Sequence, residues 1–372
     1  MKNKYNLNIK VLIAFIISFG SSPIIAQDYI LPVDPTSDLV SLMTTQGTGA
    51  DINKWAFFNK NNNALVIYDL TSREIDKRIR YEKEGPNRLV NMYIYGAMSW
   101  VNSDTIVFFD TQVNRYYLSN MQGQIYKRGS IEGGTSGFGS LTPVKSMAYR
   151  KGRIYMQSWP VRIGPDMAKN PDEVPNKIVE INLGDNTHNE VVLDFPEIYK
   201  RADYGQGLKD IDIFYHKQIE MFIINFPLSS SLYVTDLKGN IKTYPAQSDL
   251  VKNAVGMETL EGKTDENAWS DMSRWLSDHY EDMIYDEQSG YTIRIARKGI
   301  SERAYLNRDF ETEREALVFD QDFKLVQSFE LNNNILYWFF KDGYFYYNKS
   351  ITKYNFETGN ENELFFTKVK LN

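Results

Sequence analysis

The sequence contains no cysteine, and this absence excludes several kinds of chemistry and attachment. Without a thiol there is no disulfide, no thiolate nucleophile and no cysteine-ligated metal site. There is also no cysteine at which a lipobox could receive a lipid, so we expect no lipid anchor. A chain without disulfides depends on its core for stability, and 372 residues suffice to build a sizeable one.

Histidine is scarce, and the three that occur are His188, His216 and His279. None has a second histidine three to five residues away, the spacing that many zinc sites use. No Asp-x-Asp-x-Asp-Gly run indicates a calcium loop, and no Gly-x-Ser-x-Gly elbow indicates a hydrolase. The sequence therefore predicts no metal ligand, no cofactor and no catalytic residue.

An excess of positive charge is missing as well. The formal net charge is -6 at neutral pH, and no block of lysine and arginine could follow a nucleic-acid backbone. Because phosphate backbones are attracted by positive fields, we expect no nucleic-acid partner.

Long apolar runs are absent, and the longest is a nine-residue run near the start. Lys2, Lys4 and Lys10 precede this run, which covers residues 11–19, and Ala26 follows it after a Ser-Ser-Pro break. A helix needs about 20 apolar residues to span a bilayer, which disfavours the alternative of an uncleaved anchor. We expect a signal peptide over residues 1–26, export to the periplasm or secretion, and no transmembrane segment in the mature chain.

What the sequence does contain is a repeated turn pattern. An apolar strand end is followed by Asp or Asn and then a polar or glycine turn, and the copies are centred on Asp69, Asn120, Asn182, Asp236, Asp320 and Asn355. Their average separation is about 57 residues, which is typical of a propeller blade. The sequence therefore predicts an all-β fold, a six-bladed β-propeller of four-stranded antiparallel blades.

The Asp or Asn in each copy has a local physical role. Its short side chain accepts hydrogen bonds from backbone N–H groups of a tight turn. The first unit shows three clear strands, so the ring must be closed from elsewhere, and residues 29–33 and 39–43 are both candidates. In the sixth unit we expect one strand over residues 352–356.

The longest gap between copies lies between Asp236 and Asp320. Ordinary connections have about 4 to 6 residues, so this gap indicates an inserted segment. We expect residues 27–372 to form a single propeller domain with an insertion at about 245–279.

Two stretches resemble a known family. They are Glu84-Gly85-Pro86-Asn87 and the region of Tyr280, Met283-Ile284-Tyr285-Asp286 and Tyr291-Thr292-Ile293-Arg294. They are similar to the domain-of-unknown-function family DUF4221, which consists of exported, propeller-like proteins of Bacteroidota-type bacteria. The resemblance implies the fold and the compartment, and the family has no assigned activity. Many relatives carry a lipobox cysteine, which this chain lacks.

Candidate site residues lie where loops join one blade to the next and where the second strand of a blade joins the third. Arginine forks there could meet carboxylates, and aromatic rings could stack on a sugar or peptide. In the alternative interpretation, the tryptophans only pack the insertion onto its blade. The candidate ligand-binding residues are Trp269, Arg274, Trp275, His279, Arg297, Arg303, Glu84 and Asn87.

Two functions remain open. The favoured one is an exported binding propeller that recognises a peptide, glycan or partner protein through one face of the ring. The alternative is an enzyme of lactonase or lyase type, in which acids and amides of the central channel hold a divalent ion. The two differ in the side chains that inner strands present to the channel.

Overall fold

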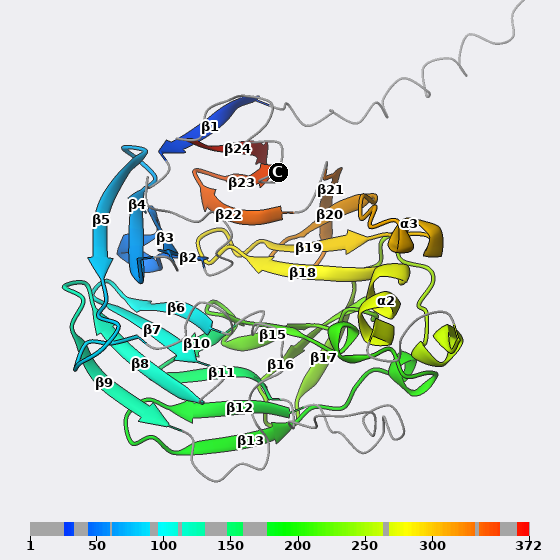
Figure 1. The fold of residues 1–372 in the computed structure, drawn as a ribbon, viewed down its shortest axis with the longest axis horizontal. Helices are drawn as coiled ribbons and strands as arrows, with labels where there is room; N and C mark the ends of the chain where they lie inside the picture. Colours follow the sequence, from blue (N-terminus) through cyan, green and yellow to red (C-terminus); the bar gives the residue numbers. More distant parts are fainter. Residues whose placement is uncertain are drawn as a thin grey trace, which may run out of the picture.

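The computed structural model describes residues 26–32, 44–59, 62–89, 96–110, 114–130, 147–158, 177–262, 268–331, 335–349 and 363–371. The strands form six four-stranded antiparallel sheets arranged around a common centre (Figure 1). The chain is thus a six-bladed β-propeller, which confirms the predicted fold class.

Blades 1 to 5 each use four consecutive strands. Blade 1 contains β2 (Thr44–Gln46), β3 (Lys54–Asn59), β4 (Ala64–Asp69) and β5 (Glu74–Arg80). Blade 2 contains β6 (Gly96–Asn102), β7 (Thr105–Asp110), β8 (Arg115–Asn120) and β9 (Ile125–Ser130). Blade 3 contains β10 (Ala148–Arg150), β11 (Arg153–Ser158), β12 (Lys177–Asn182) and β13 (His188–Val192). Blade 4 contains β14 (Asp212–His216), β15 (Met221–Asn225), β16 (Ser231–Thr235) and β17 (Ile241–Pro245). Blade 5 contains β18 (His279–Tyr285), β19 (Thr292–Arg297), β20 (Arg314–Phe319) and β21 (Leu325–Glu330). Because the first strands of successive blades contact one another, they line the centre of the ring.

Blade 6 joins the two ends of the described chain. It contains β22 (Ile335–Lys341), β23 (Tyr344–Lys349), β24 (Glu363–Lys370) and, as its outer strand, β1 (Ala26–Pro32). Tyr29 pairs with Phe366, and Leu31 pairs with Leu364. Of the two candidates for ring closure, residues 29–33 overlap β1, but this strand completes blade 6, and the first blade has its own fourth strand, β2. The alternative at residues 39–43 and the strand expected at 352–356 lie outside the described residues.

The repeated Asp and Asn residues make the hydrogen bonds that the sequence predicts. In five blades, the residue ends the third strand or follows it, and its Oδ1 accepts from a backbone N–H of the turn. These bonds measure 2.7 Å from Thr71 to Asp69, 2.9 Å from Gln124 to Asn120, 2.9 Å from Gly184 to Asn182, 2.8 Å from Lys238 to Asp236 and 2.9 Å from Asp322 to Asp320. The sixth copy, at Asn355, lies outside the described residues.

The residue after the third strand also ties together the two hairpins of its blade. The backbone N–H of Leu70 donates to the carbonyl of Asn53 (2.8 Å), and Leu183 donates to Gly152 (2.9 Å). In blade 6, the same bond runs from Leu371 to Gly343 (3.0 Å). Both hairpins of a blade therefore lie at one end of the ring, called here the hairpin end. The connections between blades lie at the opposite end, called the crossover end.

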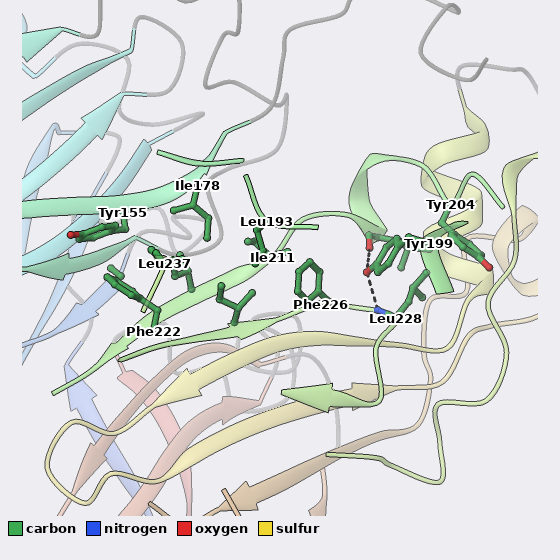
Figure 2. Packing of buried hydrophobic residues seen from close by; sticks show 14 residues of the cluster. Tyr155, Ile178, Leu193, Tyr199, Tyr204, Ile211, Phe222, Phe226, Leu228 and Leu237 are labelled. Carbon is green, nitrogen blue, oxygen red and sulfur yellow. Dashed lines mark hydrogen bonds between the residues drawn. The ribbon is translucent and has the colours of Figure 1, made fainter. Parts of the chain in front are cut away.

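Apolar side chains fill the spaces between neighbouring blades. Figure 2 shows the cluster between blades 3 and 4, where Tyr155 lies close to Phe222, with ring centres 4.5 Å apart. Near the crossover end, the buried Tyr199 hydroxyl donates to Leu208 O (2.7 Å) and accepts from Leu228 N (3.1 Å). Tyr199 belongs to the short helix η4 (Glu197–Lys200). This tyrosine therefore fixes the crossover into blade 4 to the sheet beneath it.

Short helices occupy the loops. The other 3₁₀ helices in the described ranges are η1 (Gly49–Asp51), η5 (Gln206–Leu208) and η6 (Met257–Leu260). Helix α2 (Trp269–Leu276) lies between β17 and β18, in the segment predicted as an insertion, and α3 (Glu302–Leu306) lies between β19 and β20. In the part of the chain that the structure describes, no helix has the length and apolar character that crossing a membrane requires.

Candidate functional site

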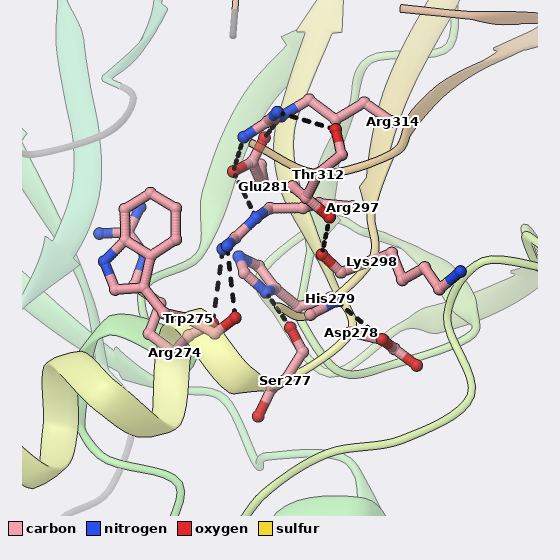
Figure 3. A network of polar contacts seen from close by, with 11 residues as sticks. Arg274, Trp275, Ser277, Asp278, His279, Glu281, Arg297, Lys298, Thr312 and Arg314 are labelled. Atoms are coloured by element: carbon pink, nitrogen blue, oxygen red, sulfur yellow. Dashed lines mark hydrogen bonds and ion pairs between the residues drawn. The ribbon is translucent and has the colours of Figure 1, made fainter. Parts of the chain in front are cut away.

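Arg297, a predicted site residue, is enclosed at the crossover end of blade 5 (Figure 3). It ends β19 and is only 1% exposed. Its guanidinium lies 4.1 Å from the centre of the Trp275 ring and donates to the carbonyls of Arg274 (3.5 Å) and Trp275 (3.3 Å). Both carbonyls belong to α2. Arg297 therefore fastens the helix of the insertion to the blade, as the packing interpretation of the sequence proposed.

Glu281 joins two arginines in this cluster. Its carboxylate lies 2.8 Å from Arg314 Nε and 3.5 Å from Arg297 Nε. Burial alone would raise the pKa of Glu281, but the charge and hydrogen bond of Arg314 outweigh it and hold the pKa at about 2. Burial lowers the pKa of Arg297 to about 10, so it stays charged at neutral pH. The three groups form a permanent internal ion-pair network.

His279, the first residue of β18, is 1% exposed. Its Nδ1 lies 2.9 Å from Ser277 O, so the neutral ring carries its proton on Nδ1 and donates it there. Burial is the main cause that lowers the pKa of His279 to about 3, against an opposing effect of Glu281. His279 is therefore neutral at physiological pH and has no exposed face for a ligand.

The other members of this predicted group also pack against protein. Trp275 lies against Phe310, with ring centres 4.4 Å apart. Tyr305 of α3 donates to Asp271 of α2 (2.9 Å), which joins the two helices. Trp269 and Arg274 are half-buried in α2, and Arg303 in α3 is exposed. The ion-pair network of Glu281, Arg297 and Arg314, together with the Trp275 ring that Arg297 contacts, is called the blade-5 clamp below.

Glu84 and Asn87 lie elsewhere. Asn87 Oδ1 accepts from the backbone N–H of Ile125, the first residue of β9 (3.1 Å), so this loop runs along the outer edge of blade 2. Glu84 is exposed. Figure 1 places β9 on one side of the ring and α2 and α3 on the other. The structure therefore does not bring Glu84 and Asn87 together with the other candidates.

A cavity of about 410 Å³ lies at the centre of the hairpin end, and we call it the channel mouth. Inner strands or their hairpins from all six blades line it. Its lining includes Thr45, Gln46, Ser99, Trp100, Tyr149, Arg150, Lys151, Tyr215, Lys217, Glu220, Tyr285, Asp286, Glu287 and Trp338. Sequence reasoning had placed the site at the opposite end of the ring and assigned the hairpins a structural role.

Most charges at the channel mouth already have partners. Lys151 lies 2.8 Å from Glu220, and Lys217 pairs with Glu287. Asp286 is buried and accepts from the backbone N–H groups of its own turn, at 3.1 and 3.3 Å. These groups hold the hairpins in place.

Arg150 differs from the other charged residues of the channel mouth. Its guanidinium carbon lies 5.0 Å from the centre of the Tyr215 ring and 5.8 Å from that of Phe222. Within the described ranges, no carboxylate lies at ion-pair distance from it. It is half-buried and belongs to the lining of the cavity. The site thus combines a cation with aromatic walls.

Across the described segments, no group of three or more histidine, aspartate or glutamate side chains is placed to hold a metal ion. Gln46 of the channel mouth is engaged as well, because its Nε2 donates to Phe340 O and its Oε1 accepts from Phe340 N (2.6 and 2.8 Å). These residues connect blades 1 and 6.

Comparisons with known proteins agree on the fold. The sequence model of a family described as "Domain of unknown function (DUF4221)" matches residues 48–327. The crystal structure of a DUF4221 family member from Bacteroides vulgatus is 19% identical with a TM-score of 0.73, over 94% of this chain and 98% of that one. The structure of a Bacteroides fragilis protein described as exported is 10% identical with a TM-score of 0.51, over 93% and 96% of the chains. No curated protein sequence matches.

Proposed function

The chain belongs to the DUF4221 family, and from this premise we propose that it is an exported binding propeller that recognises a peptide, glycan or partner protein at the channel mouth. The observation that carries the proposal is the cavity itself. It is concave, has aromatic walls, and contains a cation without an acidic partner among the described residues. Ligand sites commonly have this composition and a volume of roughly 300 to 1,000 Å³.

The proposal uses the hairpin end in place of the crossover end. At the crossover end of blade 5, Arg297 and His279 are enclosed, and Trp275 lies between Phe310 and the Arg297 guanidinium. A ligand would have to unpack α2 to reach them. At the channel mouth, Tyr149, Arg150 and Tyr215 are half-buried and line an open cavity.

The enzyme alternative needs acids or amides that are free to hold a divalent ion. The acids that line the channel mouth are Glu220, Asp286 and Glu287, and each is engaged by a lysine or by backbone N–H groups. Gln46 is engaged by backbone groups of blade 6 and of its own hairpin. The geometry of the described residues therefore favours binding over metal-assisted catalysis.

Export is part of the proposal. The lysine-rich start and the apolar run of residues 11–19 have the form of a signal peptide. The description of the Bacteroides fragilis protein as exported supports the same compartment for this chain. The destination that we propose is the periplasm or the medium.

A blocking variant tests the site. Thr45→Trp places an indole in the channel mouth, whereas Thr243→Trp places one on the exposed outer strand β17. Purified proteins with unchanged melting temperatures are screened on glycan and peptide arrays. We expect the wild type and Thr243→Trp to bind the same ligands and Thr45→Trp to lose them. Full binding by Thr45→Trp would show that recognition occurs elsewhere.

A further inference from the structure

We propose that Arg150 binds the carboxylate of a ligand whose flat or ring-shaped body packs against the aromatic walls of the channel mouth. This inference rests on the proposed function and adds the chemical class of the ligand. It starts from the balance of charge at the cavity. The two lysines form ion pairs with Glu220 and Glu287, which leaves Arg150 as the one lining cation without a carboxylate partner among the described residues.

The surroundings of Arg150 hold its guanidinium ready for an anion. Its guanidinium carbon lies 5.0 Å from the centre of the Tyr215 ring and 5.8 Å from that of Phe222, within the range of cation–π attraction, which leaves the N–H donors to other partners. A planar fork of N–H donors matches the two oxygens of a carboxylate, and the resulting bidentate pair is stronger than a neutral hydrogen bond.

The nearby acids do not compete strongly for this cation. The hydrogen bond from Lys151 is the main cause that lowers the pKa of Glu220, so its charge is matched by that lysine. Asp286 is held by the N–H groups of its turn and by the Ser289 hydroxyl. Arg150 contributes less than Lys151 to lowering the pKa of Glu220, so an incoming carboxylate meets a cation that has no described acid at ion-pair distance.

The remaining walls define the body of the ligand. Tyr149, Tyr215 and Trp338 come from three different blades and are all half-buried at the cavity. Aromatic rings of this kind pack against the apolar face of a sugar ring or against a planar side chain. Among the described residues, the hydroxyls of Thr45 and Ser99 make only long contacts of 3.5 Å to carbonyls, which favours their use by a polar ligand.

Two sources supply this chemistry, a uronic acid sugar and the free carboxyl end of a peptide. The experiment uses four probes in two matched pairs. Digalacturonate is compared with its neutral counterpart galactobiose, and the dipeptide Ala-Tyr with Ala-Tyr amide. Affinities are measured by calorimetry and by the fluorescence of the tryptophans, two of which line the cavity.

Three variants accompany the wild type. Arg150→Gln removes the cation, and Arg150→Lys keeps the charge but removes the planar fork. The control is Arg153→Gln, which removes a positive charge on β11 that pairs with Glu180 and does not line the cavity. Thermal melting verifies that each variant is folded.

We expect the acidic member of one pair to bind the wild type and Arg153→Gln about tenfold or more tightly than its neutral twin, a difference of about 1.4 kcal/mol. Arg150→Gln should abolish this preference, and Arg150→Lys should keep only part of it. The pair that shows the preference identifies the source.

Three results would overturn the inference. They are equal binding of acidic and neutral twins, a preference that survives in Arg150→Gln, and no binding of any probe at millimolar concentration. If twins bind equally and Thr45→Trp blocks both, the carboxylate inference fails while the channel mouth remains the site. If Thr45→Trp binds the probes like the wild type, both the carboxylate inference and the proposed function at the channel mouth fail.

Discussion

At the scale of single residues, polar side chains in this protein have two different structural uses. Half-buried Asp and Asn residues close hairpins by accepting hydrogen bonds from backbone N–H groups, as Asn120 does from Gln122 and Gln124. Charged residues of the blade-5 clamp are buried and satisfy one another. The first use depends on a few neighbouring residues, whereas the second depends on the complete fold.

Asn120→Ala tests the turn residues. The substitution leaves two backbone N–H groups of the hairpin between β8 and β9 without their acceptor. We expect a loss of about 1 kcal/mol in the free energy of unfolding, measured by urea denaturation. Gln122→Ala in the same turn is the control and should change little. Equal losses in both variants would contradict the assigned role of Asn120.

His279 should make stability depend on pH. Its pKa is lowered from 6.5 to about 3 in the folded protein, mainly by burial. Below pH 6.5, His279 therefore binds a proton in the unfolded chain but stays neutral in the folded protein. Neutral His279 makes its full contribution to the free energy of unfolding above pH 6.5. This contribution is lost as the pH falls towards 3, by up to about 1.4 kcal/mol per pH unit.

The prediction is that His279→Gln flattens the dependence of the unfolding free energy on pH between 6.5 and 5. Glu281 does not interfere in this interval, because its contribution decreases only below its ordinary pKa of 4.5. His216, whose pKa burial also lowers, keeps part of the slope in both proteins. His188→Gln, at the exposed first residue of β13, is the matched control for the substitution. An unchanged slope in His279→Gln would contradict the assignment.

At the scale of elements, the blade-5 clamp holds the helix α2 of the insertion in its position on blade 5. Helices α2 and α3 are short and contact each other, and α2 is also bonded to Arg297 of the blade. A helix of eight residues is not stable alone in water. The Arg297 bonds to the last turn of α2 therefore contribute to its position and to its formation.

Arg297→Met should weaken this junction strongly. The variant removes the donor to the carbonyls of Arg274 and Trp275 and one of the partners of Glu281. Removing one member of a buried ionic network costs about 3 to 5 kcal/mol. Lys298→Ala, next in the chain, removes only an exposed ion pair with Glu313 and should leave the midpoint of urea unfolding unchanged. A similar midpoint in both variants would contradict the clamp.

Sequence reasoning succeeded where the determining interactions are local. The turns at Asp69 and Asn120 follow from the preference of short polar side chains for tight turns, so the blades could be counted. It did not predict that Arg297 and His279 are buried, because charged and polar residues at strand ends usually face solvent. Both are enclosed by tertiary contacts, such as the bonds of Arg297 to α2, and these contacts are not encoded in any short pattern.

At the scale of the whole molecule, the ring depends on one strand from the start of the described chain. Tyr29 and Leu31 of β1 are buried in a cluster with Trp55, Tyr337 and Phe366. The channel mouth has the same non-local origin, because its lining comes from six blades. The sequence offered two candidates for the strand that closes the ring. It could not locate the channel mouth, because no local sequence pattern shows which residues of different blades lie close together.

Removing residues 26–32 should open the ring. We expect the truncated protein to lose cooperative unfolding and near-ultraviolet circular dichroism, because the cluster around Trp55 and Phe366 becomes exposed. A synthetic peptide with the sequence of residues 26–34 should restore both signals, whereas a scrambled peptide should not. Cooperative unfolding of the truncated protein at the wild-type midpoint would contradict closure by β1.

The mature protein should begin at Gln27. Cleavage after Ala26 leaves the pairs from Tyr29 to Pro32 of β1 intact, so the processed chain still closes its ring. Intact-mass measurement on exported protein checks this expectation. Retention of residues 1–26 in the exported protein would contradict it.

Closure by β1 also imposes an order in time. Tyr29 of β1 pairs with Phe366 of β24, a separation larger than the 294 residues between Gln46 and Phe340, which join blades 1 and 6. At about 5 to 20 residues per second, synthesis separates these residues by roughly 15 to 60 seconds. Because β1 is synthesised early, it has no partner strand until β24, near the end of the chain, has been synthesised. During that interval its open edge is a template for another copy, so crowded expression should yield strand-exchanged dimers.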